Sequence, residues 1–244
     1  MTFIEENKNQ IINSDCFDVL PKIESGSIDM VLTDMPYNIT ACHWDKEKID
    51  LEKLWTELKR IGKPNCAYVF TASQPFTTDL IMSNRKMFKY CCYWKKNYPT
   101  GIAICEYQPM RVIEEVIIFY ENQSIFNKQL RDCSKSVKDT WNDMDIMKLP
   151  SQIIGSKDHA CSGKEHIVRY LVNPINFFDF KSPNHALGTN HPSEKPVALF
   201  EYLIRTYSNE GALVLDCFSG SGTLAIACIN TNRNYICIEK DKGY

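Results

Sequence analysis

The chain has 244 residues, of which 44% are hydrophobic and 24% are charged, as expected for one globular domain with an insertion. No apolar run approaches the roughly 18 residues needed to cross a membrane, and the acidic residues 1–8 do not resemble an export signal. The formal net charge of −2 excludes a protein that binds nucleic acid by bulk charge alone, although it allows a locally basic groove. We expect a cytoplasmic protein without membrane contact.

The eleven cysteines require a disulfide scaffold and a metal site to be considered. Their number is odd, and several stand inside apolar runs such as 224–228 and 235–237. No Cys-x-x-Cys pair and no Cys/His ligand spacing occurs in the sequence. We therefore expect reduced, buried thiols and no metal site.

Short apolar segments bounded by turn residues predict seven buried strands, at 11–14, 27–33, 67–71, 90–94, 112–120, 212–216 and 234–239. Apolar residues at helical spacing predict helices over 51–61, 196–206 and 223–231. Strands that alternate with helices indicate an α/β fold with a mainly parallel sheet covered on both faces. The stretch 121–190 has no clean period and carries breakers of regular structure, so we expect a binding insertion there.

A glycine turn near the end of the chain joins an expected strand to an expected helix. The strand ends at Asp216, the turn contains Gly220 and Gly222, and Thr223 begins the helix. Glycine lets the backbone approach a ligand closely, and the helix start offers N–H groups to an anion. The next strand ends in Glu239, whose carboxylate suits the two hydroxyls of a ribose. Together these features predict a site for a nucleoside cofactor.

Two kinds of nucleoside fit this turn. Gly220-x-Gly222-x-x-Ala225 loosely matches the dinucleotide fingerprint, which would indicate a nicotinamide-dependent oxidoreductase. Dinucleotide domains usually begin with such a turn, however, whereas here it lies near the end of the sequence. Asp216, just ahead of the turn, suits a cationic amine better than a pyrophosphate. An amino-acid-bearing nucleoside such as S-adenosylmethionine therefore fits the charge better.

A second motif, Asp34-Met35-Pro36-Tyr37, follows the expected strand at 27–33. It places a carboxylate, a stiffened backbone carbonyl and an aromatic ring at the C-terminal edge of the sheet, where open α/β sheets bind ligands. The two acceptors can hold the two N–H bonds of an exocyclic amino group while its ring stacks on Tyr37. In isolation, the same residues could simply end the strand.

The tetrapeptide at 34–37 and the turn at 218–223 together resemble the S-adenosylmethionine-dependent DNA amino-methyltransferases of the β group, whose catalytic segment precedes the cofactor segment. Four further segments resemble family segments in the expected order, at 13–20, 40–45, 73–76 and 191–196. The resemblance implies a Rossmann-like, mainly parallel sheet of circularly permuted order. It divides the chain into a catalytic half at 1–120, a target-recognition insertion at 121–190 and a cofactor half at 191–244. Relatives usually continue into another helix beyond residue 244, so a partner chain or a homodimer is expected to cover that face.

The resemblance also implies the reaction: methyl transfer to the exocyclic amine of a base flipped out of double-stranded DNA. The expected catalytic residues are Asp34, Met35, Pro36 and Tyr37, with methionine where the family usually has proline, so that only its carbonyl is needed. The expected cofactor contacts are Asp15, Cys16, Asp34, Lys195, Pro196, Asp216, Phe218, Gly220, Gly222, Thr223 and Glu239. The expected contacts with the base or the DNA are Tyr37, Trp44, Lys95, Lys96 and Arg111.

The DNA contacts also have a charge rationale. Between residues 80 and 113, six basic residues stand against Glu106 alone, and aromatic residues interleave with them. Aspartate at the first position of the tetrapeptide resembles adenine-N6 enzymes more than cytosine-N4 enzymes, so adenine is favoured and cytosine is the alternative. A third interpretation is an inactive DNA-binding module, which would apply if Met35 abolishes catalysis.

Overall fold

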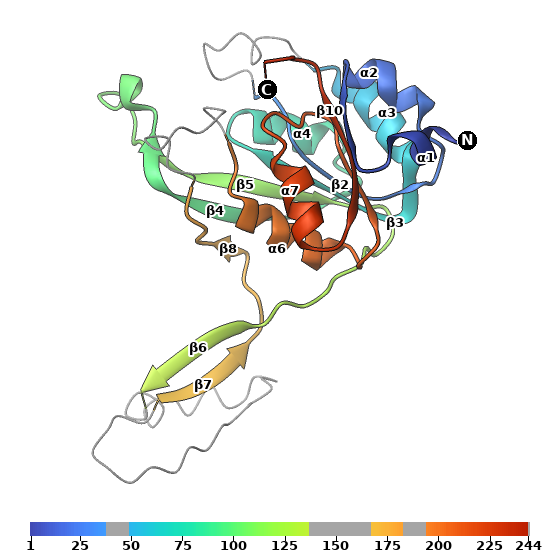
Figure 1. Ribbon diagram of the computed structural model, residues 1–244. Coiled ribbons are helices and arrows are strands. Elements are labelled where there is room, and N and C mark those ends of the chain that lie inside the picture. Colours follow the sequence, from blue (N-terminus) through green and yellow to red (C-terminus); the bar gives the residue numbers. More distant parts are fainter. Residues whose placement is uncertain (38–48, 137–166, 183–193, 244) are drawn as a thin grey trace. The chain divides into compact units, whose positions relative to one another are not determined.

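The computed structural model describes residues 1–37, 49–136, 167–182 and 194–243 (Figure 1). The chain forms two compact units, one of Met1–Asn127 with Asn176–Tyr244 and one of Lys128–Ile175. The described part of the second unit is an antiparallel ribbon of β6 (Arg131–Ser136) and β7 (Ile167–Val172). This unit falls within the stretch that the sequence predicts to be an insertion.

The first unit contains an eight-stranded sheet in the order β1-β10-β9-β2-β3-β5-β4-β8. Its strands are β1 (Gln10–Asn13), β2 (Ile28–Asp34), β3 (Gly62–Ala72), β4 (Phe88–Thr100), β5 (Arg111–Phe119), β8 (Phe177–Phe178), β9 (Leu213–Asp216) and β10 (Asn234–Glu239). The pairs β3–β5 and β4–β5 are antiparallel, and the other pairs of this described sheet are parallel. The mainly parallel α/β sheet is confirmed.

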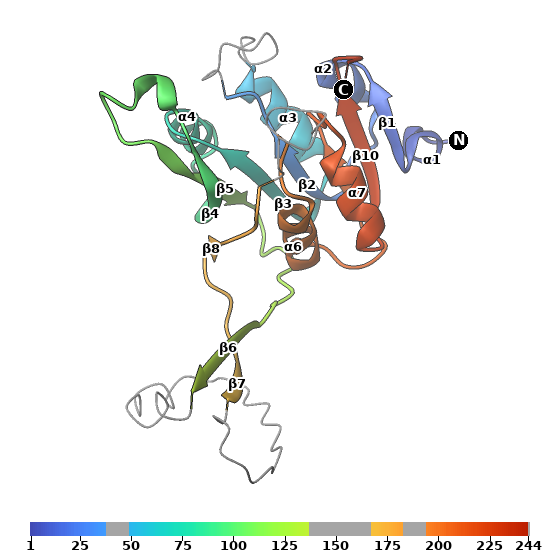
Figure 2. The same ribbon diagram turned by 60° about the vertical axis from the view of Figure 1, so that its left-hand side comes forward.

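Helices cover both faces of this sheet (Figures 1 and 2). One core lies under α1 (Phe3–Asn7), α2 (Cys16–Val19), the short 3₁₀ helix Leu20–Lys22, α3 (Leu51–Ile61) and α4 (Phe76–Ser83). The other core lies under α6 (Val197–Tyr207) and α7 (Thr223–Asn230). Along β3, Tyr68 and Phe70 pack into the first core, whereas Ala67 and Val69 pack into the second. This alternation of period two explains why residues 66–70 of the strand are all apolar.

The first strand differs from its prediction. The sequence predicts a buried strand at 11–14, but β1 lies at the edge of the sheet and Ile11 is 54% exposed. An edge strand has a neighbour on one side only, so fewer groups cover its side chains. An apolar run therefore indicates a strand without indicating its place in the sheet.

The C-terminal ends of the parallel strands meet at one edge, which becomes the candidate site. Asp34 ends β2, Asp216 ends β9 and Glu239 ends β10. The chain continues from β2 to α3 on one face and from β9 to α7 on the other, so the sheet has a topological switch point between β2 and β9. Open α/β sheets bind ligands at such a point. Within the described residues, no helix is long and apolar enough to cross a membrane.

Candidate active site

Asp34, the last residue of β2, is held by three side chains. Its Oδ1 accepts hydrogen bonds from the hydroxyls of Tyr37 and Thr71, and its Oδ2 accepts one from Lys195 Nζ at 2.6 Å. Thr71 is the residue opposite Asp34 on β3, because the two strands pair in parallel. These contacts orient both carboxylate oxygens at the edge of the sheet. The sequence analysis missed Thr71, which no motif singled out.

Tyr37 orients Asp34 in this structure. Its ring stacks on Phe76, with centroids 5.7 Å apart and an interplanar angle of 25°, and Lys195 Nζ lies 5.5 Å from its centroid. Burial, with the negative charge of Asp34, raises the pKa of Tyr37 well above its ordinary value, so the phenol stays protonated and donates. The predicted stacking of Tyr37 on a base therefore requires these contacts to rearrange.

Glu114 is a mostly buried acid that the sequence analysis missed. It lies on β5, where its Oε1 accepts a hydrogen bond from Lys96 Nζ at 3.0 Å and its Oε2 lies 3.4 Å from Lys195 Nζ. Burial by itself would raise the pKa of Glu114, but the two ammonium groups outweigh it and lower the pKa. Burial likewise opposes the charge of Lys195, yet Asp34 and Glu114 raise its pKa. The sequence feature that could have indicated Glu114 is the pair of acids at 114–115 inside a mainly apolar predicted strand.

Two of the predicted site lysines pair with acids in this structure. Lys195, which is predicted as a cofactor contact, binds Asp34 through its ammonium and lies against Glu114. Lys96 is predicted to contact DNA, but its side chain is 11% exposed and pairs with Glu114. Strand alternation along β4 explains the low exposure of Lys96, since it turns Lys96 inward and leaves Lys95 exposed. The basic stretch counted between residues 80 and 113 stops one residue before Glu114, so that count leaves out the acid that pairs with Lys96.

Glu239 organises the glycine turn after β9. The backbone N–H of Gly220 donates to Glu239 Oε2 at 2.6 Å, and that of Asp241 donates to Oε1 at 2.8 Å. Gly220 and Gly222 have φ values of +50° and +78°, which side-chain-bearing residues rarely adopt. A Cβ built on Gly220 would meet nothing within 4 Å, so the turn has open space beside it. Each carboxylate oxygen can accept a further hydrogen bond, as the predicted ribose contact requires.

Asp216 lies buried ahead of this turn, with 2% of its surface exposed. Its Oδ1 accepts hydrogen bonds from Thr33 Oγ1 at 2.6 Å and from the Phe218 N–H at 3.0 Å. Burial raises the pKa of Asp216 to about 7, and the charges of Asp34 and Glu239 add to the increase. Both donors are neutral, so a cationic ligand group would balance the ionised carboxylate. This acid, with the open glycine turn, fits the amino-acid part of S-adenosylmethionine.

The other predicted cofactor residues that the structure describes come from segments at the same edge. Asp15 caps α2 by accepting from the Phe17 N–H at 2.9 Å, and its carboxylate lies 3.3 Å from Lys240 Nζ. Burial raises the pKa of Cys16 to about 12, so this thiol is an unreactive core group. Pro196 precedes α6, Thr223 begins α7, Phe218 is half-buried, and Trp44 lies outside the described residues. No cluster of candidate metal ligands occurs in the part of the chain that the structure describes.

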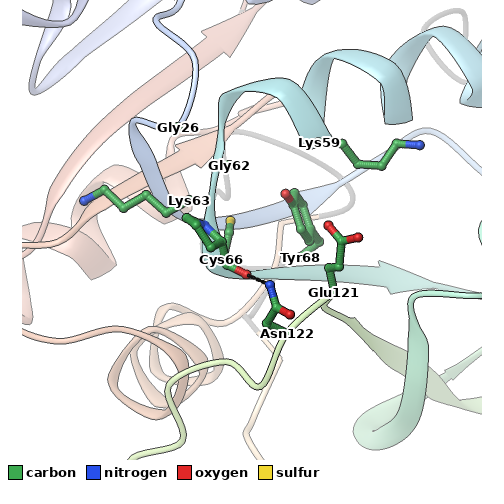
Figure 3. A pocket seen from close by; sticks show the side chains of 9 residues that line it. Gly26, Lys59, Gly62, Lys63, Cys66, Tyr68, Glu121 and Asn122 are labelled. Carbon is green, nitrogen blue, oxygen red and sulfur yellow. Dashed lines mark hydrogen bonds between the residues drawn. The ribbon is translucent and has the colours of Figure 1, made fainter.

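A hollow of about 310 Å³ lies at the other end of β3 (Figure 3). Its lining comprises Gly26, Lys59, Gly62, Lys63, Pro64, Cys66, Tyr68, Glu121 and Asn122. Asn122 closes one side by donating to the Pro64 carbonyl at 3.0 Å. None of the predicted site residues lines it, and β3 begins here whereas Thr71 lies near its end. The hollow is therefore separate from the candidate active site.

Comparison with known proteins identifies the family. Residues 28–244 match the N6/N4 methyltransferase family, described as DNA methylase. The chain belongs to this family of DNA methyltransferases. It is 28% identical to the type II methyltransferase M1.MboII of Moraxella bovis, over 97% of this chain and 93% of the relative. It is 26% identical to the DNA adenine methyltransferase YhdJ of Escherichia coli K12, over 96% and 79% of the two chains.

Solved structures share the fold of this methyltransferase. M1.HpyAVI, in complex with S-adenosylmethionine, has a TM-score of 0.62 at 24% identity, covering 96% of this chain and 94% of the other. The cytosine-N4-specific PvuII methyltransferase has a TM-score of 0.64 at 14% identity, covering 95% and 82%. The predicted family, fold and S-adenosylmethionine cofactor are confirmed, and the oxidoreductase alternative is wrong.

Glu239→Gln should weaken S-adenosylmethionine binding by about 1.5–3 kcal/mol, the value for losing a charge-assisted hydrogen bond. The substitution removes the carboxylate that is assigned to the ribose and that orients the Gly220 N–H. Isothermal titration calorimetry at pH 8 measures the change. Glu57→Gln, on α3 and paired with Arg60, is the control and should keep the parental affinity. Unchanged binding in Glu239→Gln would mean that the acid only shapes the turn.

Met35→Leu should keep the single-turnover rate of methyl transfer within a few-fold of the parent. The Met35 side chain is 2% exposed and packs into the core under α3, so only its backbone carbonyl is available to a base. Met35→Ala should instead lower the free energy of unfolding by about 2–5 kcal/mol, because it leaves a cavity. Chemical denaturation and rapid-quench assays separate the two effects. A hundredfold slower rate in well-folded Met35→Leu would show that the side chain itself is required.

Proposed function

We propose that this methyltransferase transfers a methyl group from S-adenosylmethionine to N6 of adenine in double-stranded DNA. The observation that carries the proposal is the Asp34 carboxylate, oriented by Tyr37, Thr71 and Lys195 at the switch point of the sheet. Aspartate at the head of the tetrapeptide supports adenine over cytosine. The similarity to YhdJ, which is named as an adenine methyltransferase, supports the same choice.

S-adenosylmethionine supplies an electrophilic methyl group on a sulfonium, and the chain supplies position and charge. Asp34 and the Met35 carbonyl each accept one N–H of the target amine, which aims the nitrogen lone pair at the methyl group. Positive charge develops on this nitrogen as it attacks. The Asp34 carboxylate stabilises that charge until one amine proton is lost. Positioning therefore supplies most of the catalysis, without a covalent enzyme intermediate.

The base must leave the duplex before it can reach Asp34, at a cost of a few kcal/mol. The Tyr37 hydroxyl donates to Asp34 Oδ1, the oxygen that we assign to the amine. We propose that the entering amine replaces this hydroxyl, and that the displaced Tyr37 ring then stacks on the base. Until the base enters, the Tyr37 hydroxyl thus supplies a hydrogen bond to Asp34 Oδ1.

Methyl transfer from tritium-labelled S-adenosylmethionine to unmethylated genomic DNA tests the proposal. Nucleoside mass spectrometry of the product should detect N6-methyladenine. Detection of N4-methylcytosine would overturn the choice of base while leaving the reaction class intact. A folded chain that binds S-adenosylmethionine and DNA but transfers no methyl group would support the inactive DNA-binding module.

The hairpin of β4 and β5 is the surface that we assign to DNA. It projects from the catalytic edge of the sheet and carries a short 3₁₀ helix, Ile102–Ile104, at its tip (Figure 1). Lys95 is exposed, Tyr98 and Tyr107 are 61% and 87% exposed, and Arg111 Nη1 donates to the Gln74 carbonyl at 3.4 Å. Basic and aromatic side chains together suit a surface that follows phosphates.

Lys95→Gln should weaken binding to all DNA sequences alike and reduce the slope of log K against log salt by about one. Fluorescence anisotropy with labelled duplexes at several salt concentrations measures this slope. The control is Lys63→Gln, at the opposite end of the sheet, where Lys63 Nζ pairs with Asp29 at 2.6 Å. An equal slope for Lys95→Gln and the parent would show that Lys95 does not contact the DNA phosphates.

A further inference from the structure

The ion pair between Asp34 and Lys195 opposes the chemistry assigned to Asp34. Lys195 Nζ lies 2.6 Å from Asp34 Oδ2, and the lysine side chain is only 6% exposed. In a partly desolvated site, an ammonium at this distance cancels much of the field that the carboxylate presents to a neighbouring group. The target amine gains positive charge as it reacts, so it needs that field. Another group must offset the charge of Lys195.

Glu114 contacts the same ammonium. Its Oε2 lies 3.4 Å from Lys195 Nζ, its side chain is 14% exposed, and its Oε1 is held by Lys96 at 3.0 Å. Oε2 is buried and accepts no well-aligned hydrogen bond among the described residues, so its effect on Lys195 is electrostatic. Two carboxylates and two ammonium groups cancel in formal charge. Removing Glu114 would leave a net positive charge beside Asp34.

The backbone of β5 places Glu114 on the face where Lys195 lies. Val116 and Ile118, two and four residues further on, pack into the core under α6, and Lys195 stands just before that helix. Glu115 points to the opposite face, where it accepts a hydrogen bond from Thr77 Oγ1 at 3.2 Å. Strand alternation therefore separates two adjacent glutamates, and only Glu114 reaches the network around Asp34.

We propose that Glu114 is a positioning residue for methyl transfer. It shares the Lys195 ammonium with Asp34, and so leaves Asp34 the negative charge that the reacting amine requires. The inference rests on the proposed function, because it takes Asp34 to receive the amine. Glu114 contacts neither base nor cofactor in this assignment and acts through Lys195.

Glu114→Gln tests the inference, since it keeps the size of the side chain and removes its charge. The single-turnover rate at saturating DNA should fall about 10- to 100-fold, which is the loss seen when a group that orients a metal ligand is removed and which we carry over to Glu114. The Kd for S-adenosylmethionine and the DNA concentration giving half-maximal rate should stay within about threefold of the parent, because binding groups are untouched. Glu114→Asp, which retains the charge, should recover part of the rate. The matched control Glu115→Gln should keep the parental rate.

Thermal unfolding and calorimetric titration with S-adenosylmethionine verify that each variant is folded. If Glu114→Gln does not fold, Glu114→Gln/Lys96→Gln restores equal numbers of positive and negative charges. This double variant should also react slowly, because Lys195 still pairs with Asp34 alone. A parental rate in either folded variant would overturn the inference and leave Glu114 a structural role. A parent that binds S-adenosylmethionine but methylates no DNA would overturn the proposed function, and the inference with it, before any variant is compared.

Discussion

Asp34→Asn should lower the single-turnover rate of methyl transfer by at least about a thousandfold, a loss of roughly 4 kcal/mol of transition-state stabilisation. Asparagine keeps the shape of the side chain and can still accept hydrogen bonds from Thr71 and Tyr37. It lacks the negative charge that stabilises the developing charge on the amine, and it leaves Lys195 with Glu114 as its remaining acid. Asp34→Ala should be at least as slow. Rapid-quench measurement of labelled DNA gives the rate.

The control for this experiment is Asp29→Asn on the same strand. Asp29 lies at the other end of β2, where it pairs with Lys63 and accepts from the Leu213 N–H at 2.9 Å. Its loss should cost some stability and leave the rate of methyl transfer unchanged. We assign Asp34 to the base and no longer to the cofactor contacts expected from the sequence, so affinity for S-adenosylmethionine should stay near the parental value in both variants. Near-normal turnover in Asp34→Asn would remove the catalytic role of Asp34.

Binding of S-adenosylmethionine should weaken as the pH falls through about 7, because the pKa of the buried Asp216 is raised to about 7. Only the ionised carboxylate can pair with the ammonium group of the ligand. Affinity should therefore be level above about pH 8 and should fall toward tenfold per pH unit below 7. Asp216→Asn should bind about 10- to 150-fold more weakly at pH 8, which is about 1.5–3 kcal/mol, and should lose this pH dependence.

The same acid should act in the opposite direction on the stability of the ligand-free protein. Its folded pKa lies above the value of about 3.9 for an unfolded chain, so the folded state holds the extra proton between about pH 4 and 7. The stabilising contribution is complete below about pH 4 and is lost as the pH rises through 7. Asp216→Asn should therefore be more stable than the parent at pH 8, by on the order of 2–4 kcal/mol.

Urea denaturation at pH 5 and pH 8, with calorimetric titration at the same pH values, checks both effects. The variant should gain free energy of unfolding at pH 8 and lose affinity for the cofactor there. Thr33→Val is the companion variant: it removes one hydrogen bond to Asp216 Oδ1 and keeps the charge, so it should retain the pH dependence. A pH-independent affinity in the parent would show that Asp216 does not pair with the ligand.

The local sequence was sufficient for seven strands of the eight-stranded sheet, for the helices α3, α6 and α7, and for the two motifs at the edge of the sheet. It did not predict the short helices α1 and α2, the helix α4, or the strands β6, β7 and β8. Short, continuous apolar segments predicted these strands, because burial on both faces of a sheet makes a strand apolar along its length, and apolar residues at helical spacing predicted the three helices. The tetrapeptide at 34–37 and the glycine turn at 218–223 were evident for a similar reason. Each motif is six residues long or shorter, follows the end of an expected strand, and contains residue types that both a turn and a ligand require.

Only the tertiary structure decided which groups meet around Asp34. Lys195 is 161 residues away from it in sequence, and Glu114 lies on an antiparallel strand beyond β3. No local pattern records such contacts, because strand order and register determine them. The sequence could not distinguish the two neighbouring lysines on β4 either. Lys95 is exposed, whereas Lys96 is mostly covered and pairs with Glu114, because strand alternation turns the two side chains to opposite faces. The same limit applies to β1, whose apolar residues indicate a strand while only the sheet order places it at the edge.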